Sequence, residues 1–409
     1  MKVKKISLSD FRNAQSECVE FSDGVNVLYG KNASGKTNLL EAIYLCAAGK
    51  SFRRCDEKNF IAHGHNRSNI FLEYSESGCK DDGDVRTIEI THFSDGKKLK
   101  RQTKLDGIKT ESASEAVGRF RAVIFTPDNL SIVKGLPEER RRFLDMVMSQ
   151  ASKNYIHCLV MYNKRLKYKN DLLRNAKQSF GKVKVDPIML ESINLTLSEY
   201  AVKVVDYRRS FCEKLSEYAS GFYNEFSDGK ESLEIKYVSQ LPDNDGLSFE
   251  ESVTKVCDIY NSMAESEISS GFTLFGPHRD DISMKLKIHG DKTIPDSEVE
   301  ITSDLSEQEM SDEISMGYAA KFFGSRGQQR SIVLSLKLAE GEMLKDFTGE
   351  YPVFLLDDVF SELDSARRGF ILSKLCDRQV IITCCDCDIF GNSFDFSKVF
   401  ACDGKYSRK

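Results

Sequence analysis

The fold class is decided by the run Gly30-Lys31-Asn32-Ala33-Ser34-Gly35-Lys36-Thr37, which satisfies the pattern G-x-x-x-x-G-K-[ST] in full. A short apolar segment, residues 24–29, precedes it and is typical of a strand buried on both faces. A helical pattern with apolar residues at positions 39, 40, 43 and 44 follows it. A strand, a glycine loop and a helix in this order favour a phosphate-binding loop over a chance Gly-Lys-Thr turn.

The chemistry of such a loop requires these residue types. Glycines let the backbone curl so that successive N–H groups point inward, and the helix N-terminus adds a positive partial charge. We expect Lys36 to reach the β- and γ-phosphates and the Thr37 hydroxyl to coordinate Mg²⁺. The sequence therefore predicts a nucleoside triphosphate site whose nucleotide-binding residues are Gly30, Lys31, Asn32, Ala33, Ser34, Gly35, Lys36, Thr37 and Asn38.

A second strand-like segment, residues 353–356, runs into Asp357 and Asp358. In phosphate-loop proteins a carboxylate at the end of the neighbouring strand holds the Mg²⁺ shell, and we assign this role to Asp357. Asp358 is placed to polarise an attacking water as a general base, so Asp358 and Lys36 are the predicted catalytic residues. Two solvated aspartates at a strand end are the alternative interpretation.

Two further motifs favour the functional interpretation. Ser325-Arg326-Gly327-Gln328 opens a helical pattern, and a turn of small residues at a helix N-terminus is a second anion site of the same physical kind. Ser361-Glu362-Leu363-Asp364 follows the carboxylate pair. The combination resembles the heads of ABC-type ATPases. That resemblance implies an α/β head with a mixed sheet built from both chain ends, and an ATP-dependent homodimer in which Ser325, Gly327 and Gln328 complete the partner's ATP site.

Longer stretches of the chain are more specific still. They are residues 49–53, 125–145, 275–281 and 325–330, and together they resemble the RecF family of bacterial recombination mediators. The resemblance spans essentially the whole chain. It implies a DNA-binding protein that acts at single-strand gaps, at junctions of single- and double-stranded DNA and at stalled replication forks. It also implies that RecO, RecR and RecA are partners, that the protein supports the SOS response, and that slow ATP hydrolysis serves as a switch.

The motif positions predict three segments. Residues 1–126 form the N-terminal part of the head, residues 127–271 an inserted helical arm, and residues 272–409 the C-terminal part of the head. Helical patterns cover 155–174, 187–226 and 249–266. The longest would extend roughly 45 to 60 Å at ~1.5 Å per residue. No heptad pattern is sustained over the three or four repeats that a coiled coil requires, which disfavours a long SMC-like or Rad50-like rod.

Clusters of basic residues predict a surface that binds DNA without reading its sequence. Each Lys or Arg that meets a phosphate releases counterions, so such binding is sensitive to salt. For any one cluster, a solvated helix face is the alternative. The candidates are Arg53 and Arg54 near the ATP site, Arg140, Arg141 and Arg142, Lys164, Arg165, Lys167 and Lys169 with Tyr162 and Tyr168, Arg208 and Arg209, and the group at 97–104.

Composition limits the class of protein. The 409 residues carry a net charge of −5, so binding to nucleic acid has to depend on local patches and not on the field of the whole protein. No apolar run approaches the ~18 to 20 residues of a membrane span. The basic N-terminus leads into no apolar segment, and the 12 cysteines are scattered. These features predict a cytoplasmic protein in a reducing compartment, with no membrane partner.

Some positions depart from the ABC pattern. Thr126-Pro127-Asp128 stands where such ATPases place a glutamine, and we predict that Asp128 senses the metal-bound water. Thr383 stands where transporters place a histidine, and it is the predicted γ-phosphate sensor. These two departures, at Asp128 and at Thr383, predict slow ATP hydrolysis. An acidic stretch, 296–313, is interpreted as a solvated loop or a partner-facing gate, and the C-x-x-C at 384–387 as strand-end thiols in preference to a metal site.

Three rival functions remain open. A structural DNA-organising ATPase of the SMC type would need a long arm. A nuclease of the OLD type would need a further carboxylate-rich domain, and only 45 residues follow Asp364. A transporter ATPase would associate with a membrane.

Overall fold

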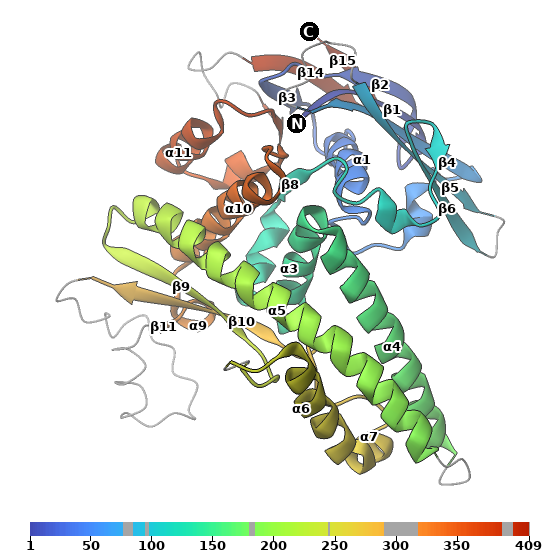
Figure 1. Ribbon diagram of the computed structural model, residues 1–409. Coiled ribbons are helices and arrows are strands. Elements are labelled where there is room, and N and C mark those ends of the chain that lie inside the picture. Colours follow the sequence, from blue (N-terminus) through green and yellow to red (C-terminus); the bar gives the residue numbers. More distant parts are fainter. Residues whose placement is uncertain are drawn as a thin grey trace. The chain divides into compact units, whose positions relative to one another are not determined.

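The computed structural model describes residues 1–76, 85–94, 98–179, 185–243, 246–289, 318–386 and 396–408 (Figure 1). The chain forms two compact units. The head unit comprises Met1–Leu130, Ser149–Ala151 and Leu336–Lys409, and the arm unit comprises Ser131–Met148 and Ser152–Ser335. The predicted boundary at 271/272 is therefore displaced, because the described residues between 272 and 335 belong to the arm unit and not to the head unit. The acidic stretch 296–313 lies outside the described residues.

A six-stranded mixed sheet forms the centre of the head unit. Its order is β15-β14-β3-β13-β12-β8, with every neighbouring pair parallel except β14 and β15. Both chain ends contribute strands, which confirms the fold class expected from the sequence. Strands β8, β12 and β13 are buried along their whole length and β3 over its three middle residues, as is typical of parallel strands covered on both faces. The bounds are β3 Val25–Tyr29, β8 Ala122–Phe125, β12 Val353–Asp357, β13 Val380–Cys384, β14 Phe396–Cys402 and β15 Lys405–Arg408.

A second sheet of the head unit is entirely antiparallel, in the order β2-β1-β4-β5-β6-β7. In β4 buried and more exposed residues alternate strictly, which is the pattern of a strand with one face against a core. Helix α1, Lys36–Ala48, packs against strands of both sheets (Figure 1). The bounds are β1 Lys2–Phe11, β2 Ala14–Glu20, β4 Arg67–Ser75, β5 Val85–Ser94, β6 Leu99–Leu105 and β7 Ile108–Lys109.

Other head elements contact strands β8 and β12 of the central sheet. At the first residue of the edge strand β8, the Ala122 N–H donates to Oε1 of Gln150 at 2.9 Å. Helix α10 spans Arg326–Thr348, and its residues from Leu336 onward belong to the head. A Cβ at Gly341 would lie 2.4 Å from the Phe354 ring, so this helix approaches β12 too closely for any other residue. The short elements are η1 Glu57–Phe60, η2 Ala113–Glu115, η3 Pro127–Leu130, η5 Val359–Glu362 and α11 Ser365–Leu375.

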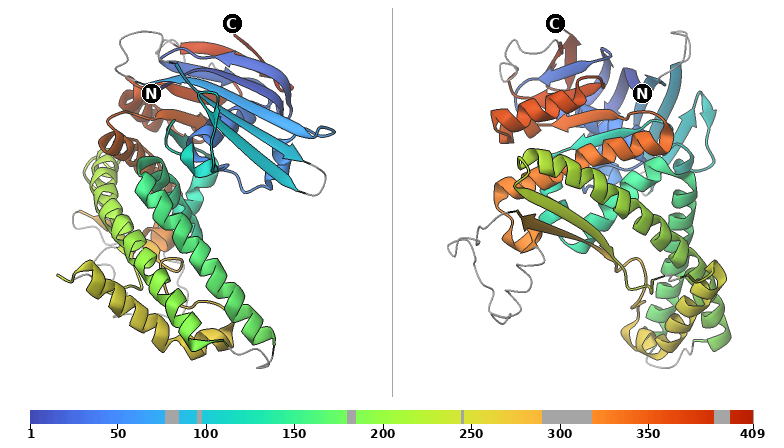
Figure 2. Two further views of the ribbon diagram at one scale, coloured as in Figure 1. Left: turned by 45° about the vertical axis from the view of Figure 1, so that its right-hand side comes forward. Right: turned by 60° about the vertical axis from the view of Figure 1, so that its left-hand side comes forward.

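Helices dominate the arm unit (Figure 2). The pattern at 187–226 predicts α5, Pro187–Phe226, to the residue, with Pro187 at the first helical position and Asp186 accepting a cap bond from the Ile188 N–H. The predicted helix at 249–266 is instead divided at Met263 into α6 and α7. At 1.5 Å per residue α5 is about 60 Å long, which is too short for a rod. The other helices are α2 Ser131–Lys134, α3 Pro137–Ala151, α4 Lys153–Gln178, α6 Phe249–Ser262, α7 Ala264–Ser270 and α9 Ala320–Phe323.

A three-stranded sheet completes the arm unit, in the order β11-β10-β9, with bounds Tyr318–Ala319, Asp281–Ile288 and Glu231–Val238. Helix α5 packs against β9 (Figure 2). Two serines of α5 satisfy main-chain groups on the open edge of β9: Ser216 Oγ accepts from Ile235 N at 3.1 Å, and the Ser220 hydroxyl donates to Leu233 O. The helix thus occupies an edge that could otherwise pair with another chain. Across the described part of the chain, no helix combines the length and apolarity needed to cross a membrane.

Candidate nucleotide-binding site

The phosphate loop lies between β3 and α1, as the sequence predicts. Gly30 and Gly35 have φ angles of 154° and 103°, and Gly35 is the N-cap of α1. A Cβ on Gly30 would lie 2.1 Å from the carbonyl oxygen of Ala401, so only glycine fits there. The two glycines let the loop curl tightly over the first turn of the helix.

The side chains of the loop suit an anion. Lys36 is 8% exposed, and its ammonium group donates to the carbonyl oxygens of Gly30 at 2.6 Å and Lys31 at 2.8 Å. The Ser34 hydroxyl is buried and has no hydrogen-bond partner among the described residues. A buried ammonium, an unpaired hydroxyl and a helix N-terminus together fit the phosphates of a nucleotide.

The predicted metal ligands meet beside the loop. Thr37 Oγ1 donates to Asp357 Oδ1 at 2.8 Å, and Thr383 Oγ1 donates to the same oxygen at 2.8 Å. Thr383 is brought there by the register of β13, which pairs it with Asp357 on β12. Burial raises the pKa of Asp357, while the hydroxyls of Thr383 and Thr37 and the charge of Arg53 oppose the rise.

This donor set fits Mg²⁺ in a particular way. A hydroxyl and one carboxylate beside a phosphate site are the ligands that Mg²⁺ takes when substrate phosphates and waters complete its shell. Among the described residues there is no cluster of three or more His, Cys, Asp or Glu that could hold an ion without a nucleotide. Thr37 and Asp357 would therefore hold the metal together with the nucleotide.

Asp358 ends β12 in a left-handed conformation, with φ of 54°. Its N–H donates to Thr383 Oγ1 at 2.9 Å, and its carbonyl oxygen accepts from Ser361 Oγ at 2.7 Å. A non-glycine residue in this region is strained, and such strain concentrates at functional sites. The turn separates Asp358 from the buried Asp357 and leaves it half-buried at the carboxyl edge of the sheet.

A buried carboxylate on α1, which sequence reasoning missed, organises the neighbouring basic residues. Glu41 is fully buried and accepts two bonds from Arg12, at 3.0 and 2.9 Å, and one from Ser51 at 2.6 Å. Arg53 reaches Glu41 at 3.5 Å and donates to Asn38 Oδ1 at 2.9 Å. The signal available in the sequence was one glutamate in an otherwise apolar stretch of helix. The cluster places Arg53 next to the phosphate loop.

The C-terminal hairpin β14–β15 supports the loop from outside, which the sequence did not indicate either. Tyr406 donates its hydroxyl to Gly35 O at 2.9 Å, and the Gly404 N–H donates to Ser34 O at 2.9 Å. Both acceptors are carbonyl groups of the phosphate loop. Burial raises the pKa of Tyr406, so its hydroxyl stays protonated as a donor.

The signature residues Ser325, Gly327 and Gln328 lie in the arm unit, whereas the phosphate loop lies in the head unit. Ser325 and Gln328 cap α10 reciprocally. The Ser325 hydroxyl accepts from the Gln328 N–H at 3.2 Å, and the Gln328 side-chain oxygen accepts from the Ser325 N–H at 2.7 Å. Ser325 is exposed and Gly327 is half-buried.

Several predicted DNA-binding residues are buried in ion pairs. Arg140 donates two bonds to Asp281, at 2.6 and 2.8 Å, and is 5% exposed. Lys169 and Arg208 are also buried, with Glu267 and Asp145 as partners. These three are removed from the DNA-binding set because a buried, neutralised cation cannot reach a phosphate backbone. The basic runs in the sequence did not show which of their residues are buried in ion pairs and which face solvent.

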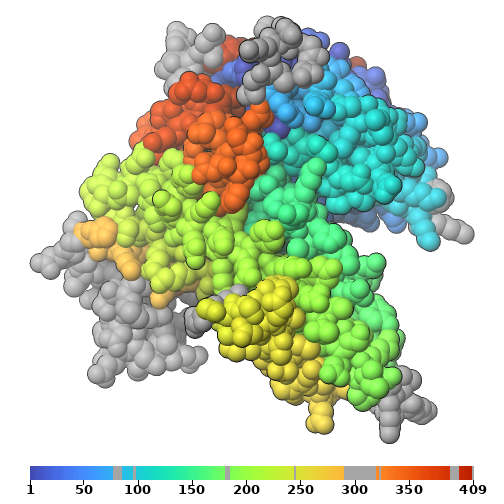
Figure 3. All heavy atoms as spheres, in the orientation of Figure 1, coloured from blue at the N-terminus to red at the C-terminus, as the bar shows by residue number. Residues whose placement is uncertain are grey.

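The other candidates stay closer to solvent. Lys164 is exposed and Arg165 half-buried on α4, whose side chains form a continuous surface with those of α5 and α6 (Figure 3). Arg54 is exposed in the head. Arg141 is half-buried and donates to Asp280 O at 2.6 Å.

Two other predicted features lie in the head. Asp128, the predicted sensor of the metal-bound water, is exposed in η3. In the C-x-x-C motif, Cys385 donates to Asn32 Oδ1 at 2.9 Å, whereas Cys387 lies outside the described residues.

The motif at 275–281 is a structural junction of the arm. His278 Nδ1 lies 2.7 Å from Tyr162 Oη, and its Nε2 lies 3.3 Å from Thr273 O. The Asp280 carboxylate is buried and accepts bonds from Tyr237, Ser239 and the Gln240 N–H. Gly276 has φ of 125°, and a Cβ there would lie 2.4 Å from the Tyr260 hydroxyl. His278 is therefore a hydrogen-bonded structural residue of the arm.

Burial of His278 predicts that the arm loses stability in acid. Its pKa is lowered to about 4, chiefly by burial, against about 6.5 in the unfolded chain. The folded form therefore binds fewer protons, so the stabilisation is complete above pH ~6.5 and is lost as the pH falls through about 4. At 1.36 kcal/mol per pKa unit the loss is about 3 kcal/mol.

The measurement is the free energy of unfolding between pH 7.5 and 4 for the wild type and His278→Gln. We expect the free energy of unfolding of the variant to depend less steeply on pH than that of the wild type. The variant should retain the pH dependence that comes from His92, whose pKa burial also lowers to about 4. His157→Gln, at an exposed position, is the control. Equal slopes for the wild type and His278→Gln would contradict the assignment.

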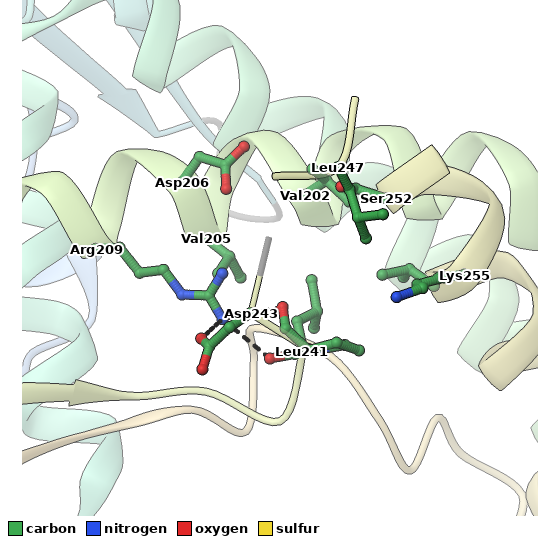
Figure 4. Close-up of a pocket in the computed structure, with 11 residues that line it drawn as sticks. Val202, Val205, Asp206, Arg209, Leu241, Asp243, Leu247, Ser252 and Lys255 are labelled. Carbon is green, nitrogen blue, oxygen red and sulfur yellow. Dashed lines mark hydrogen bonds and ion pairs between the residues drawn. The ribbon is translucent and has the colours of Figure 1, made fainter. Parts of the chain in front are cut away.

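A cavity of about 10 Å³ lies in the arm between α5, the loop before α6 and α6 itself (Figure 4). That volume admits one water molecule. Arg209 is held beside it by the carbonyl oxygen of Leu241 at 3.0 Å and by the Asp243 carboxylate at 2.9 Å. The cavity is too small for a ligand.

The phosphate loop, the Thr37–Asp357–Thr383 contacts and the sheet built from both chain ends define an ABC-type ATPase head. The chain matches the family described as RecF/RecN/SMC N terminal domain over residues 2–408. It belongs to the RecF family of DNA replication and repair proteins.

The similarity extends over nearly the full length. The RecF protein of Clostridium perfringens (strain SM101) is 34% identical over 401 residues, 98% of each chain. That of Clostridium botulinum (strain Alaska E43) is 36% identical over 409 residues, 99% of each. A solved structure of the recombination mediator protein RecF with ATPrS, in the RecFOR pathway, has a TM-score of 0.84 and 31% identity, covering 100% of this chain and 98% of that one. An SMC head bound to a domain of ScpA shares the fold, with a TM-score of 0.52 at 15% identity, covering 100% and 98% of the chains.

Proposed function

We propose that this chain is an ATP-dependent dimerisation switch that binds DNA during recombinational repair. The observation that carries the proposal is the pair of hydroxyl bonds, from Thr37 and from Thr383, to a single oxygen of Asp357 beside the phosphate loop. Such a site fits Mg²⁺ and ATP, and the solved RecF structures with ATP or ATPrS support the same nucleotide.

Each residue of the site has a separate role in slow ATP hydrolysis. Bound Mg²⁺ would neutralise charge on the phosphates. Lys36 exchanges its contacts with the loop carbonyls for phosphate oxygens, and Thr37 and Asp357 hold the metal. Thr383 keeps Asp357 in place and senses the γ-phosphate. Asp358 accepts the proton of the attacking water, and a second copy supplies Ser325 and Gly327 to close the site.

DNA and protein partners follow from the family. We infer binding to single-stranded DNA and to junctions, with RecO, RecR and RecA as partners, a contribution to the SOS response and a cytoplasmic location. Lys164, Arg165, Arg141 and Arg54 are the remaining DNA contacts, with Arg53 beside the nucleotide. Closure of two heads around ATP would hold DNA, and hydrolysis would release it.

Light scattering with and without ATP and gapped DNA tests this function. We expect the wild type to dimerise with ATP and Ser325→Arg to remain monomeric while still binding ATP, because an arginine obstructs the composite site. Loss of the α10 cap by itself costs only about 1 kcal/mol. The matched control is Ser248→Arg, which removes the equivalent capping box of α6. A wild type that stays monomeric with saturating ATP and DNA would overturn the proposal.

A further inference from the structure

The carboxylate of Glu231 connects the signature turn to the longest helix of the arm. Its Oε1 accepts from Gln328 Nε2 at 2.8 Å, and its Oε2 accepts from the Tyr223 hydroxyl at 2.6 Å. Glu231 is the first residue of β9, and Tyr223 lies in the last turn of α5. Both carboxylate oxygens are thus occupied by groups from two different elements of the arm unit.

The bonds continue to the residue that the ABC resemblance assigns to the partner's nucleotide. The Gln328 side-chain oxygen accepts from the Ser325 N–H at 2.7 Å, while its nitrogen donates to Glu231. One amide therefore connects Ser325 to Glu231, and Glu231 to Tyr223. Glu231 is itself fixed, because its N–H and its carbonyl oxygen both bond to Ser227 Oγ, at 3.3 and 2.9 Å.

We propose that Glu231 and Tyr223 are positioning residues that set the orientation of the signature turn and link it to the arm. Gln328 then acts through Ser325 and not as a nucleotide ligand, which differs from the role expected from the sequence. Bonds to a carboxylate are stronger than bonds between neutral groups, so this arrangement can hold a short turn in place.

The link gives the arm a way to regulate pairing of the heads, a consequence that rests on the proposed function. Helix α5 packs along α4, which carries the exposed Lys164, and along α6. DNA that shifts α5 would move Tyr223 and Glu231, and with them the turn. Because the two sites are coupled, ATP-dependent pairing would also strengthen binding of DNA to the arm.

The positioning role is tested first in the monomer without nucleotide. Amide hydrogen exchange at residues 325–330 is measured for the wild type, Tyr223→Phe and Glu231→Ala. We expect exchange about fivefold faster in Tyr223→Phe and faster again in Glu231→Ala, because one and two bonds are lost. The matched control is Ser220→Ala, which removes another α5–β9 bond, to Leu233 O, without touching Glu231. Equal exchange in Tyr223→Phe and Ser220→Ala would overturn the proposal.

The coupling is tested by the ATP concentration at half-dimerisation, with and without gapped DNA. We expect DNA to lower this midpoint in the wild type and in Ser220→Ala, and to lower it much less in Tyr223→Phe, whose ATP binding as a monomer is unchanged. A Tyr223→Phe protein that responds to DNA like Ser220→Ala would overturn the coupling. A wild type that never dimerises would instead overturn the proposed function, and the exchange experiment would still decide the positioning role.

Discussion

Replacing Asp358 by Asn is expected to slow ATP hydrolysis by about 10²- to 10⁴-fold, the usual contribution of a general base. The substitution preserves size and removes only the ability to accept a proton from water. The neighbouring metal site is left intact, because Thr37 and Thr383 bond to Asp357 and the Asp358 contact with Thr383 is made by the main-chain N–H. ATP binding and ATP-dependent dimerisation are therefore expected to persist, with a longer-lived dimer.

Single-turnover hydrolysis with excess protein, followed alongside light scattering, separates the chemical step from dimerisation. Asp377→Asn serves as the control, since Asp377 is an exposed carboxylate of the same unit just before β13. Hydrolysis by Asp358→Asn at the wild-type rate would exclude Asp358 as the base. Loss of ATP binding in this variant would show that the carboxylate acts in the nucleotide site and not on water.

The parts of the fold that local sequence determines were predictable. The phosphate loop, the strand that ends at Asp357 and helix α5 each depend on a contiguous pattern, and the structure places them as expected. The resemblance to ABC ATPases also indicated Thr383, at the end of the strand that follows β12 in the chain, and this strand, β13, pairs in parallel with β12 so that Thr383 lies opposite Asp357. These predictions needed only local propensities and the rule that the carboxyl ends of parallel strands meet at one edge.

Contacts between distant parts of the chain were not predictable from one sequence. Tyr406 lies 371 positions from Gly35, and Glu231 lies 97 positions from Gln328, yet each pair shares a hydrogen bond. The domain boundary at 271/272 was displaced for the same reason, since strand pairing of β9 with β10 draws residues after 271 into the arm. The Arg140 side chain is buried because it pairs with Asp281, and only the fold determines the position of Asp281.

Lys169 shows how burial reverses the meaning of a basic cluster. Its ammonium nitrogen lies 2.7 Å from Glu267 Oε2, and both side chains are fully buried. The same nitrogen lies 4.3 Å from the centre of the Tyr260 ring, and Glu267 Oε1 accepts from the Leu274 N–H at 2.9 Å. Burial lowers the pKa of Lys169, although the charge of Glu267 opposes it. The pair connects α4 to α7 and has no access to DNA.

Lys169→Met is therefore expected to lower the free energy of unfolding by about 3–5 kcal/mol, because it leaves the Glu267 carboxylate buried without its partner. Urea unfolding followed by a probe in the arm measures the change. Arg174→Met is the matched control on the same helix: it breaks the exposed pair with Asp171 and should cost less than about 1 kcal/mol. The double variant Lys169→Met with Glu267→Met should recover most of the loss, since apolar groups of similar volume can replace a buried ion pair. If Lys169→Met costs no more than Arg174→Met, water reaches the pair in solution, and Lys169 would return to the DNA-binding candidates.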